Sequence, residues 1–97
     1  MAFRFEFDEA AARDLRKLTR RDQPLLLSIV TGHIPAILRD PHGAGEKKKG
    51  DLAHVRAYNL KVNNVAYRLI YTIDDDVVLF VAIGVRDEAY ARAAWRR

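Results

Sequence analysis

Three strand-like runs separated by very short polar turns constrain the fold of this chain more than any other feature. The runs span residues 55–62, 65–73 and 77–83. Asn63-Asn64 suits a tight hairpin turn, and the three aspartates at 74–76 suit the next one. Such short connections make consecutive strands antiparallel, so the sequence predicts an antiparallel meander. The third run is apolar at almost every position, which indicates a central strand covered on both faces.

The first half of the chain predicts one strand followed by two helices. Residues 3–7 alternate phenylalanine with charged residues, which is the period of a half-buried strand. Asp8 is suited to cap the first helix, and a second helix is expected to begin around Asp22. Gly32 and Pro35 lie within that second helix, so we expect a kink or break there.

These elements, taken in order, define the fold class. Asp87 is expected to cap a final helix over residues 88–95, which gives the order β-α-α-β-β-β-α. We therefore predict one α+β domain over residues 1–97, an antiparallel sheet with helices packed on one face. A chain of 97 residues is long enough for a single core.

Charge and composition narrow the possible partners and chemistry. The 17 lysines and arginines exceed the 13 acidic residues and give a formal net charge of +4, which favours an anionic partner such as nucleic acid or an acidic protein. The chain has no cysteine, which excludes disulfides and thiolate catalysis. The histidines and acids show no metal-ligand spacing, so we expect no metal. No apolar run could span a membrane and no signal peptide is apparent, so a cytoplasmic protein is expected.

Sorting the strand residues by face brings three polar side chains together. The alternation along the first two runs of the meander places Asn59, Lys61 and Arg68 on one less apolar face. A two-residue turn would pair Asn59 with Arg68, whereas a four-residue turn would pair Lys61 with Arg68. In either register two like charges are close, which costs energy unless an anion relieves it. With Arg86 at the end of the third strand, three converging cations suggest a phosphate site.

Two sequence motifs carry a resemblance to a known family. They are YRLIY at residues 67–71 and GVRDEAY at 84–90, preceded by the strand AYNLKV at 57–62. In this order and spacing they resemble the RelE/ParE superfamily of bacterial toxins, specifically its RelE-like ribonuclease branch. The elements of the first half also fit, so the resemblance covers nearly the whole chain.

The resemblance implies a RelE-like fold and the toxin of a type II toxin–antitoxin system. Such toxins are endoribonucleases that need neither metal nor cofactor, cut mRNA in the A site of the ribosome, and so inhibit translation. A cognate antitoxin protein neutralises them. Cleavage is expected to proceed by attack of the RNA 2′-hydroxyl on the adjacent phosphorus, which leaves a 2′,3′-cyclic phosphate.

The resemblance also implies roles for particular residues. Arg68 and Arg86 would hold the scissile phosphate, Lys61 would favour the ionised 2′-hydroxyl or the developing charge, and Tyr90 would stack on a base or orient a reacting oxygen. The family commonly has two lysines, two residues apart, on the strand after the loop. Here Lys61 matches the second lysine, and Asn59 stands at the first position.

Further residues are candidates for RNA contacts or proton transfer. Residues 47–49 are three consecutive lysines, and this basic loop is either solvated or bound to RNA backbone. His54 is a candidate acid or base. His33 is expected to pack along the second helix. The residues predicted to bind RNA are Asn59, Arg56, Lys47, Lys48 and Lys49.

Two alternative functions stay open at the level of the sequence. A ParE-like branch of the superfamily inhibits DNA gyrase, and such a protein would not need the RNA-cutting residues. A degenerate toxin homologue would bind an antitoxin or RNA without cleaving anything, and Asn59 in place of a lysine is the feature that suggests it.

Overall fold

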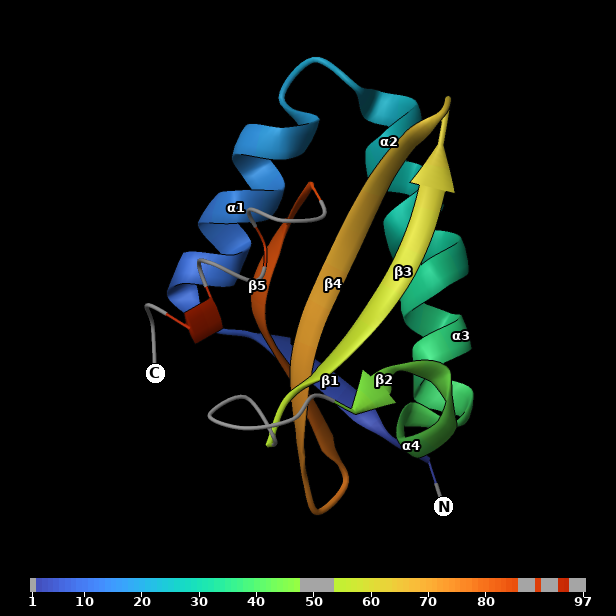
Figure 1. Cartoon of the computed structure of the whole chain (residues 1–97), viewed down its shortest axis with the longest axis vertical. Coiled ribbons are helices and arrows are strands. Elements are labelled where there is room, and N and C mark those ends of the chain that lie inside the picture. Colours follow the sequence, from blue (N-terminus) through green and yellow to red (C-terminus); the bar gives the residue numbers. More distant parts are fainter. Residues whose placement is uncertain (1, 48–53, 86–88, 90–92, 95–97) are drawn as a thin grey trace.

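The computed structural model describes residues 2–47, 54–85, 89, 93 and 94. Figure 1 shows the arrangement of its elements. They are β1 (Arg4–Phe7), α1 (Glu9–Thr19), α2 (Gln23–Ser28), the π-helical turn η1 (Ile29–His33), α3 (Ile34–Arg39), α4 (Pro41–Ala44), β2 (Glu46–Lys47), β3 (Arg56–Val62), β4 (Val65–Asp74) and β5 (Val77–Val85). The predicted strands and the first two predicted helices occur in the predicted order, but α4 and β2 lie between them in a segment for which the sequence predicted neither helix nor strand.

In the described part of the chain, the strands form one five-stranded sheet in the order β1-β5-β4-β3-β2. The predicted meander β3-β4-β5 is confirmed, and both of its pairings are antiparallel. The expectation of an antiparallel sheet does not extend to β1, which pairs with β5 in parallel. Short turns fix the strand direction within the meander, whereas helices connect β1 to it, and so turn length could not fix the direction of β1. The two-residue strand β2, which the sequence did not predict, pairs with the start of β3.

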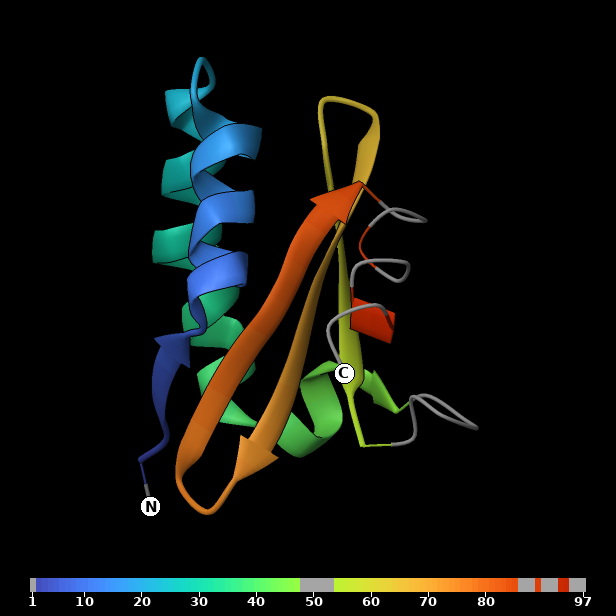
Figure 2. The same cartoon turned by 90° about the vertical axis from the view of Figure 1, so that its left-hand side faces the viewer.

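The helices α1 to α3 lie on one face of the sheet, as predicted (Figure 2). Their main apolar side chains pack with those of β3, β4 and β5 in a core that includes Leu25, Ile29 and Phe80. Of the predicted final helix, Ala89, Ala93 and Ala94 are described and helical. Ala89 and Ala93 pack against Ala82 on the opposite face, so both faces of the sheet are covered. No described helix is long and apolar enough to cross a membrane.

A β-bulge in β5 changes which face of the sheet its side chains point to partway along the strand. The pairing shifts between Ile70 and Tyr71, so that Ala82 pairs with Ile70 and Phe80 with Tyr71. Val81 is the extra residue, and it packs on the same face as Ala82. The prediction that the third run of the meander lies inside the sheet, covered on both faces, is confirmed, with β5 between β1 and β4.

The predicted break in the second helix takes the form of the π-helical turn η1. The N–H of Ile34 donates to the carbonyl of Ile29, five residues earlier. Pro35 follows immediately and has no N–H to continue the α-helical pattern. The wider turn lets α2 and α3 continue along the same face of the sheet, and Ile29 and Ile34 both stay buried in the core.

A buried carboxylate completes the edge of β5 beyond the end of β1. The pairing of β1 with β5 stops at Phe7 and Phe80. Further along β5, the N–H of Ile83 donates to Asp14 Oδ2 of α1 at 3.0 Å. Asp14 is only 7% exposed, so this bond ties the first helix to the central strand in the interior.

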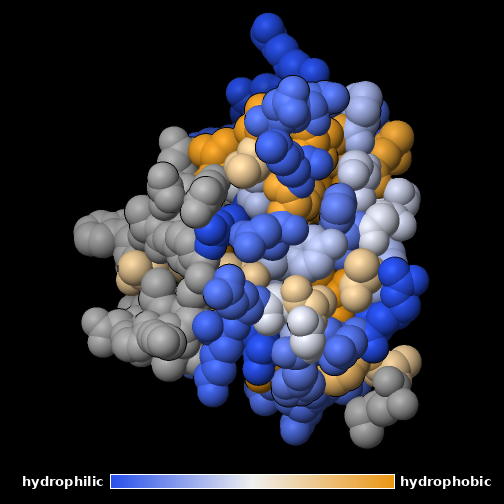
Figure 3. Space-filling view, turned by 45° about the vertical axis from the view of Figure 1, so that its right-hand side comes forward, coloured by the Kyte–Doolittle hydropathy of each residue, from blue (hydrophilic) through white to orange (hydrophobic). Residues whose placement is uncertain are grey.

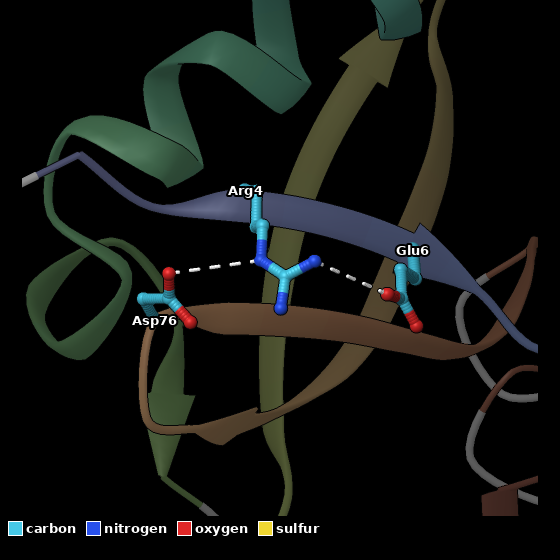
Figure 4. Close-up of polar contacts among 3 residues, drawn as sticks. All are labelled: Arg4, Glu6 and Asp76. Atoms are coloured by element: carbon cyan, nitrogen blue, oxygen red, sulfur yellow. Dashed lines mark ion pairs between the residues drawn. The ribbon is translucent and has the colours of Figure 1, made fainter.

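Figure 4 shows how the side chain of Arg4 links β1 to the β4–β5 turn. Its guanidinium lies 3.6 Å from Asp76 and 3.8 Å from Glu6. These side chains are largely exposed, so their ion pairs contribute little to stability. The backbone bond from Arg4 N–H to the Asp76 carbonyl, at 2.9 Å, and the stacking of Phe7 on Phe80 hold the strand more firmly.

Tyr71 anchors α4 against the sheet. Its hydroxyl donates to the carbonyl of Pro41 at 2.6 Å, and both residues are buried. A Cβ at Gly45 would run into the Tyr71 hydroxyl, so this position requires glycine. Burial raises the pKa of Tyr71 above its ordinary value of 10.0, because the ionised phenolate would lose its hydration.

We predict that Asp14→Ala lowers the free energy of unfolding by about 1–3 kcal/mol, because the buried N–H of Ile83 loses its acceptor. Asp14→Asn keeps an oxygen acceptor of the same shape and should cost less. Urea unfolding of the three proteins measures the difference. Equal losses in the two variants would show that the bond to Ile83 does not stabilise the fold.

We also predict that Tyr71 makes the protein less stable at alkaline pH. The folded state holds the phenol proton more tightly than the unfolded state, so this contribution is complete below pH 10 and is lost as the pH rises past 10. Tyr71→Phe should be less stable at neutral pH but lose less stability between neutral and strongly alkaline pH. Unfolding free energies measured across that range test the prediction, and parallel pH profiles would contradict it.

Candidate functional site

A two-residue turn sets the register of the β3–β4 hairpin. Asn63 and Asn64 have φ angles of 51° and 67°, the left-handed conformation that such turns require. Asn59 consequently lies directly opposite Arg68, and Lys61 lies opposite Ala66. The first of the two registers allowed by the sequence is therefore the correct one.

Three successive cross-strand pairs of this hairpin line a hollow of about 380 Å³. The lining residues are Asn59, Leu60, Lys61, Ala66, Tyr67 and Arg68. Asn59 and Lys61 are exposed, whereas Arg68 is only 8% exposed. Lys61 is the diagonal neighbour of Arg68 on the same face, because its partner Ala66 lies two residues before Arg68. We call this the hairpin hollow.

The other two polar residues of the hairpin hollow, Asn59 and Lys61, lie on β3. Arg68 lies on β4 between Asn59 of β3 and Gly84 of β5. Gly84 is buried and has no side chain, so β5 contributes no side chain beside Arg68 at this pair. A cation with so little access to water is weakly screened and attracts an anion more strongly than an exposed cation does.

Several predicted site residues lie outside the part of the chain that the structure describes. They are Lys48, Lys49, Arg86 and Tyr90. The described part of β5 ends at Val85, which pairs with Tyr67, the residue before Arg68. The chain thus passes next to the hairpin hollow just before Arg86 in the sequence.

The remaining predicted RNA-binding residues line a second hollow. It measures about 230 Å³ and is lined by His42, Lys47, His54, Arg56 and Ile73. We call it the α4 hollow. Successive side chains of β3 point to alternate faces of the sheet, so Arg56 and Asn59, three residues apart, face opposite sides. The structure therefore does not bring Arg56 and Lys47 into the hairpin hollow.

The three histidines lie in different surroundings. His33 packs as expected, with its Nδ1 2.9 Å from the Tyr58 hydroxyl. His54 lines the α4 hollow and not the hairpin hollow. His42 lies in α4, where its ring contacts that of Phe3 and its carbonyl accepts a hydrogen bond from Arg56. Within the described residues, no three potential ligands gather to hold a metal ion.

The comparisons with known proteins agree with this fold. The mRNA interferase toxin RelE of Escherichia coli strain K12 is 33% identical over 102 residues, which cover 99% of this chain and 98% of that protein. A solved arginine mutant of E. coli RelE in the free state has a TM-score of 0.70 at 28% identity, covering 99% and 98% of the two chains. The RelBE2 toxin–antitoxin complex of Mycobacterium tuberculosis has a TM-score of 0.69 at 26% identity, covering 89% of this chain and 100% of the matched chain.

The family assignment rests on the greater part of the sequence. Residues 8–93 match the family described as the ParE-like toxin of type II bacterial toxin-antitoxin systems. This range includes both hollows and every strand of the sheet except β1. Together with the full-length similarity to RelE, the match shows that this chain belongs to the ParE-like toxin family of type II toxin–antitoxin systems.

Proposed function

We propose that this protein is an endoribonuclease that cleaves mRNA on the ribosome without a metal ion. The observation that carries the proposal is the hairpin hollow, where a buried arginine and an exposed lysine share one face of the sheet. The similarity to a toxin named as an mRNA interferase supports RNA as the substrate.

The chemistry follows from the charges in the hairpin hollow. The guanidinium of Arg68 would bind the oxygens of the scissile phosphate, and its planar fork suits two of them at once. Lys61 would stabilise the negative charge that develops as the 2′-hydroxyl attacks phosphorus. The bond from phosphorus to the 5′-oxygen then breaks, leaving a 2′,3′-cyclic phosphate and a 5′-hydroxyl. We extend the site to Arg86 and Tyr90, as the sequence motif implies.

Dependence on the ribosome follows from what the hairpin hollow offers. None of the described residues that line it is a histidine or a carboxylate, the usual general bases. Positive charge can stabilise the transition state, but it does not align the 2′-hydroxyl with the leaving oxygen. A ribosome that holds the message in a bent conformation would supply this alignment, which contributes a large part of the rate in such reactions.

An antitoxin is the expected protein partner. Solved relatives include toxin–antitoxin complexes, among them RelBE2 of M. tuberculosis. The net charge of +4 on this chain suits an acidic partner. Such a partner would neutralise the toxin by covering the hairpin hollow or by excluding the RNA.

We predict that Lys61→Ala lowers the rate of message cleavage on programmed ribosomes by roughly 10²–10³-fold, the loss typical of removing one group that stabilises the transition state. Arg68→Ala should lower it at least as much. Lys17→Ala is the matched control, because Lys17 is an exposed lysine on α1, outside the residues that line the hairpin hollow. Single-turnover cleavage is the measurement, and thermal unfolding verifies that each variant is folded.

The same proteins distinguish the alternative functions. Full cleavage by Lys61→Ala and Arg68→Ala would contradict the site assignment. Inhibition of gyrase supercoiling without any message cleavage would identify a gyrase inhibitor. Wild-type protein that binds RNA or antitoxin but neither cleaves messages nor arrests growth would identify a degenerate toxin.

We further predict that Asn59→Lys raises the cleavage rate on the order of tenfold, since one added charge close to the phosphate contributes about 1–2 kcal/mol at partly exposed sites. The new lysine would lie opposite Arg68, so stability should fall slightly through repulsion of like charges. Asn59→Gln adds length without charge and serves as the control. An unchanged rate in Asn59→Lys, with the fold intact, would show that this position does not contribute to phosphate binding.

A further inference from the structure

The α4 hollow is built from segments that the fold holds firmly in place. Tyr71 fixes α4 through the Pro41 carbonyl, as described above. The ring of Phe3 contacts the ring of His42 edge-on, with centroids 6.2 Å apart. The strand β2 places Lys47 beside Arg56 by direct pairing with β3. His42 and Lys47 are therefore held in place by contacts to Phe3, β3 and β4.

Arg56 is oriented within the hollow by two backbone carbonyls. Its Nη1 donates to the carbonyl of His42 at 2.7 Å and to that of Gly45 at 3.3 Å. Both bonds use the same nitrogen, so they leave the other N–H groups of the guanidinium available for a ligand. An oriented guanidinium loses little conformational entropy on binding, which favours recognition of an oxyanion.

The chemistry of the lining selects a phosphate over a peptide. The described residues that form the α4 hollow include one arginine, one lysine and two histidines but no carboxylate, and Ile73 is the only large apolar side chain among them. A peptide partner would need apolar or aromatic anchors, which usually carry most of the binding energy. On the side seen in Figure 3, hydrophilic residues cover much of the surface, and the largest hydrophobic area lies toward the top.

We propose that the α4 hollow binds a backbone phosphate of RNA and forms a second contact, separate from the hairpin hollow. The proposal deepens and rests on the proposed RNA-directed function. Arg56 would bind the phosphate directly, Lys47 would neutralise its charge from the rim, and His42 and His54 would donate hydrogen bonds. The phosphate could belong to the message or to ribosomal RNA, since the chemistry is the same in both.

The strand β3 connects the two hollows. Arg56 begins it, and Asn59 and Lys61 lie further along. At about 3.3 Å per residue, the Cα atoms of Arg56 and Asn59 are roughly 10 Å apart along the strand. The two residues face opposite sides of the sheet, and the described residues of β2 pair with Arg56 and Ala57. A single RNA strand that uses both hollows would therefore cross the edge of β3 beyond β2.

The test compares RNA binding by wild type, Lys47→Gln, Arg56→Gln and the control Lys17→Gln. The probe is a single-stranded RNA that cannot be cleaved because 2′-O-methyl groups replace its 2′-hydroxyls. Lys47 is exposed, so Lys47→Gln should fold normally even if Arg56→Gln disturbs the anchoring of α4. Affinity is measured by fluorescence anisotropy over a range of salt concentrations, and the same variants are tested for binding to programmed ribosomes.

Loss of one phosphate contact should weaken binding and reduce the slope of log affinity against log salt by about 0.7 in Lys47→Gln, with no change in Lys17→Gln. On ribosomes, the α4-hollow variants should raise KM for message cleavage more than they lower kcat. A reduced slope on free RNA assigns the phosphate to the message, and a loss confined to ribosomes assigns it to ribosomal RNA.

The outcomes separate this inference from the proposed cleavage. If messages are not cut by wild type but the slope still falls in Lys47→Gln, the α4 hollow binds phosphate and the endoribonuclease proposal fails. If cleavage depends on Lys61 and Arg68 while Lys47→Gln and Arg56→Gln bind free RNA and ribosomes like wild type, the α4 hollow is not an RNA site. Weakened binding of antitoxin alone, with RNA binding unchanged, would likewise overturn the inference.

Discussion

The two-residue turn at Asn63 and Asn64 determines where every side chain of β3 and β4 points. Both residues adopt the left-handed backbone conformation, which asparagine tolerates better than most residues. This turn places Asn59 opposite Arg68. The side chains of the hairpin that then meet the helices include Leu60, Tyr67, Leu69 and Tyr71. A slip of one residue would exchange the two faces and bury Lys61. The chemistry of the hairpin hollow thus depends on a turn that itself carries no charge.

β5 imposes a second constraint, because its side chains pack against a different layer on each face of the sheet. Its bulge at Val81 puts Val81 and Ala82 on one face, while Phe80 and Ile83 stay in the main core. Small residues face the described C-terminal alanines, and large residues face the helices. The bulge also precedes Gly84, the neighbour of Arg68, so its placement helps to position the candidate site.

Local patterns in the sequence predicted most of the elements, though not α4 or β2, and the face shared by the polar residues of the hairpin hollow, because these depend on contacts between near neighbours in the chain. Alternation and short turns were enough to place Asn59, Lys61 and Arg68 on one face. The parallel pairing of β1 could not be predicted in this way, since it joins segments about seventy residues apart, Arg4–Phe7 and Val77–Phe80. The α4 hollow was missed for the same reason. Its residues come from three separate segments, and carbonyl groups, which sequence patterns do not reveal, orient Arg56.

The position of β5 has a consequence for how this protein is made. β5 (Val77–Val85) lies between β1 and β4 in the sheet, yet among the described strands it comes last along the chain and is synthesised after the other four. Until it emerges from the ribosome, β1 has no partner and the main core lacks Phe80 and Ile83. Pairings between such distant segments also form slowly, because a long loop must close first. A chain that lacks β5 therefore cannot assemble the surroundings of Arg68, and the candidate site can form only after β5 has been synthesised and paired with β4.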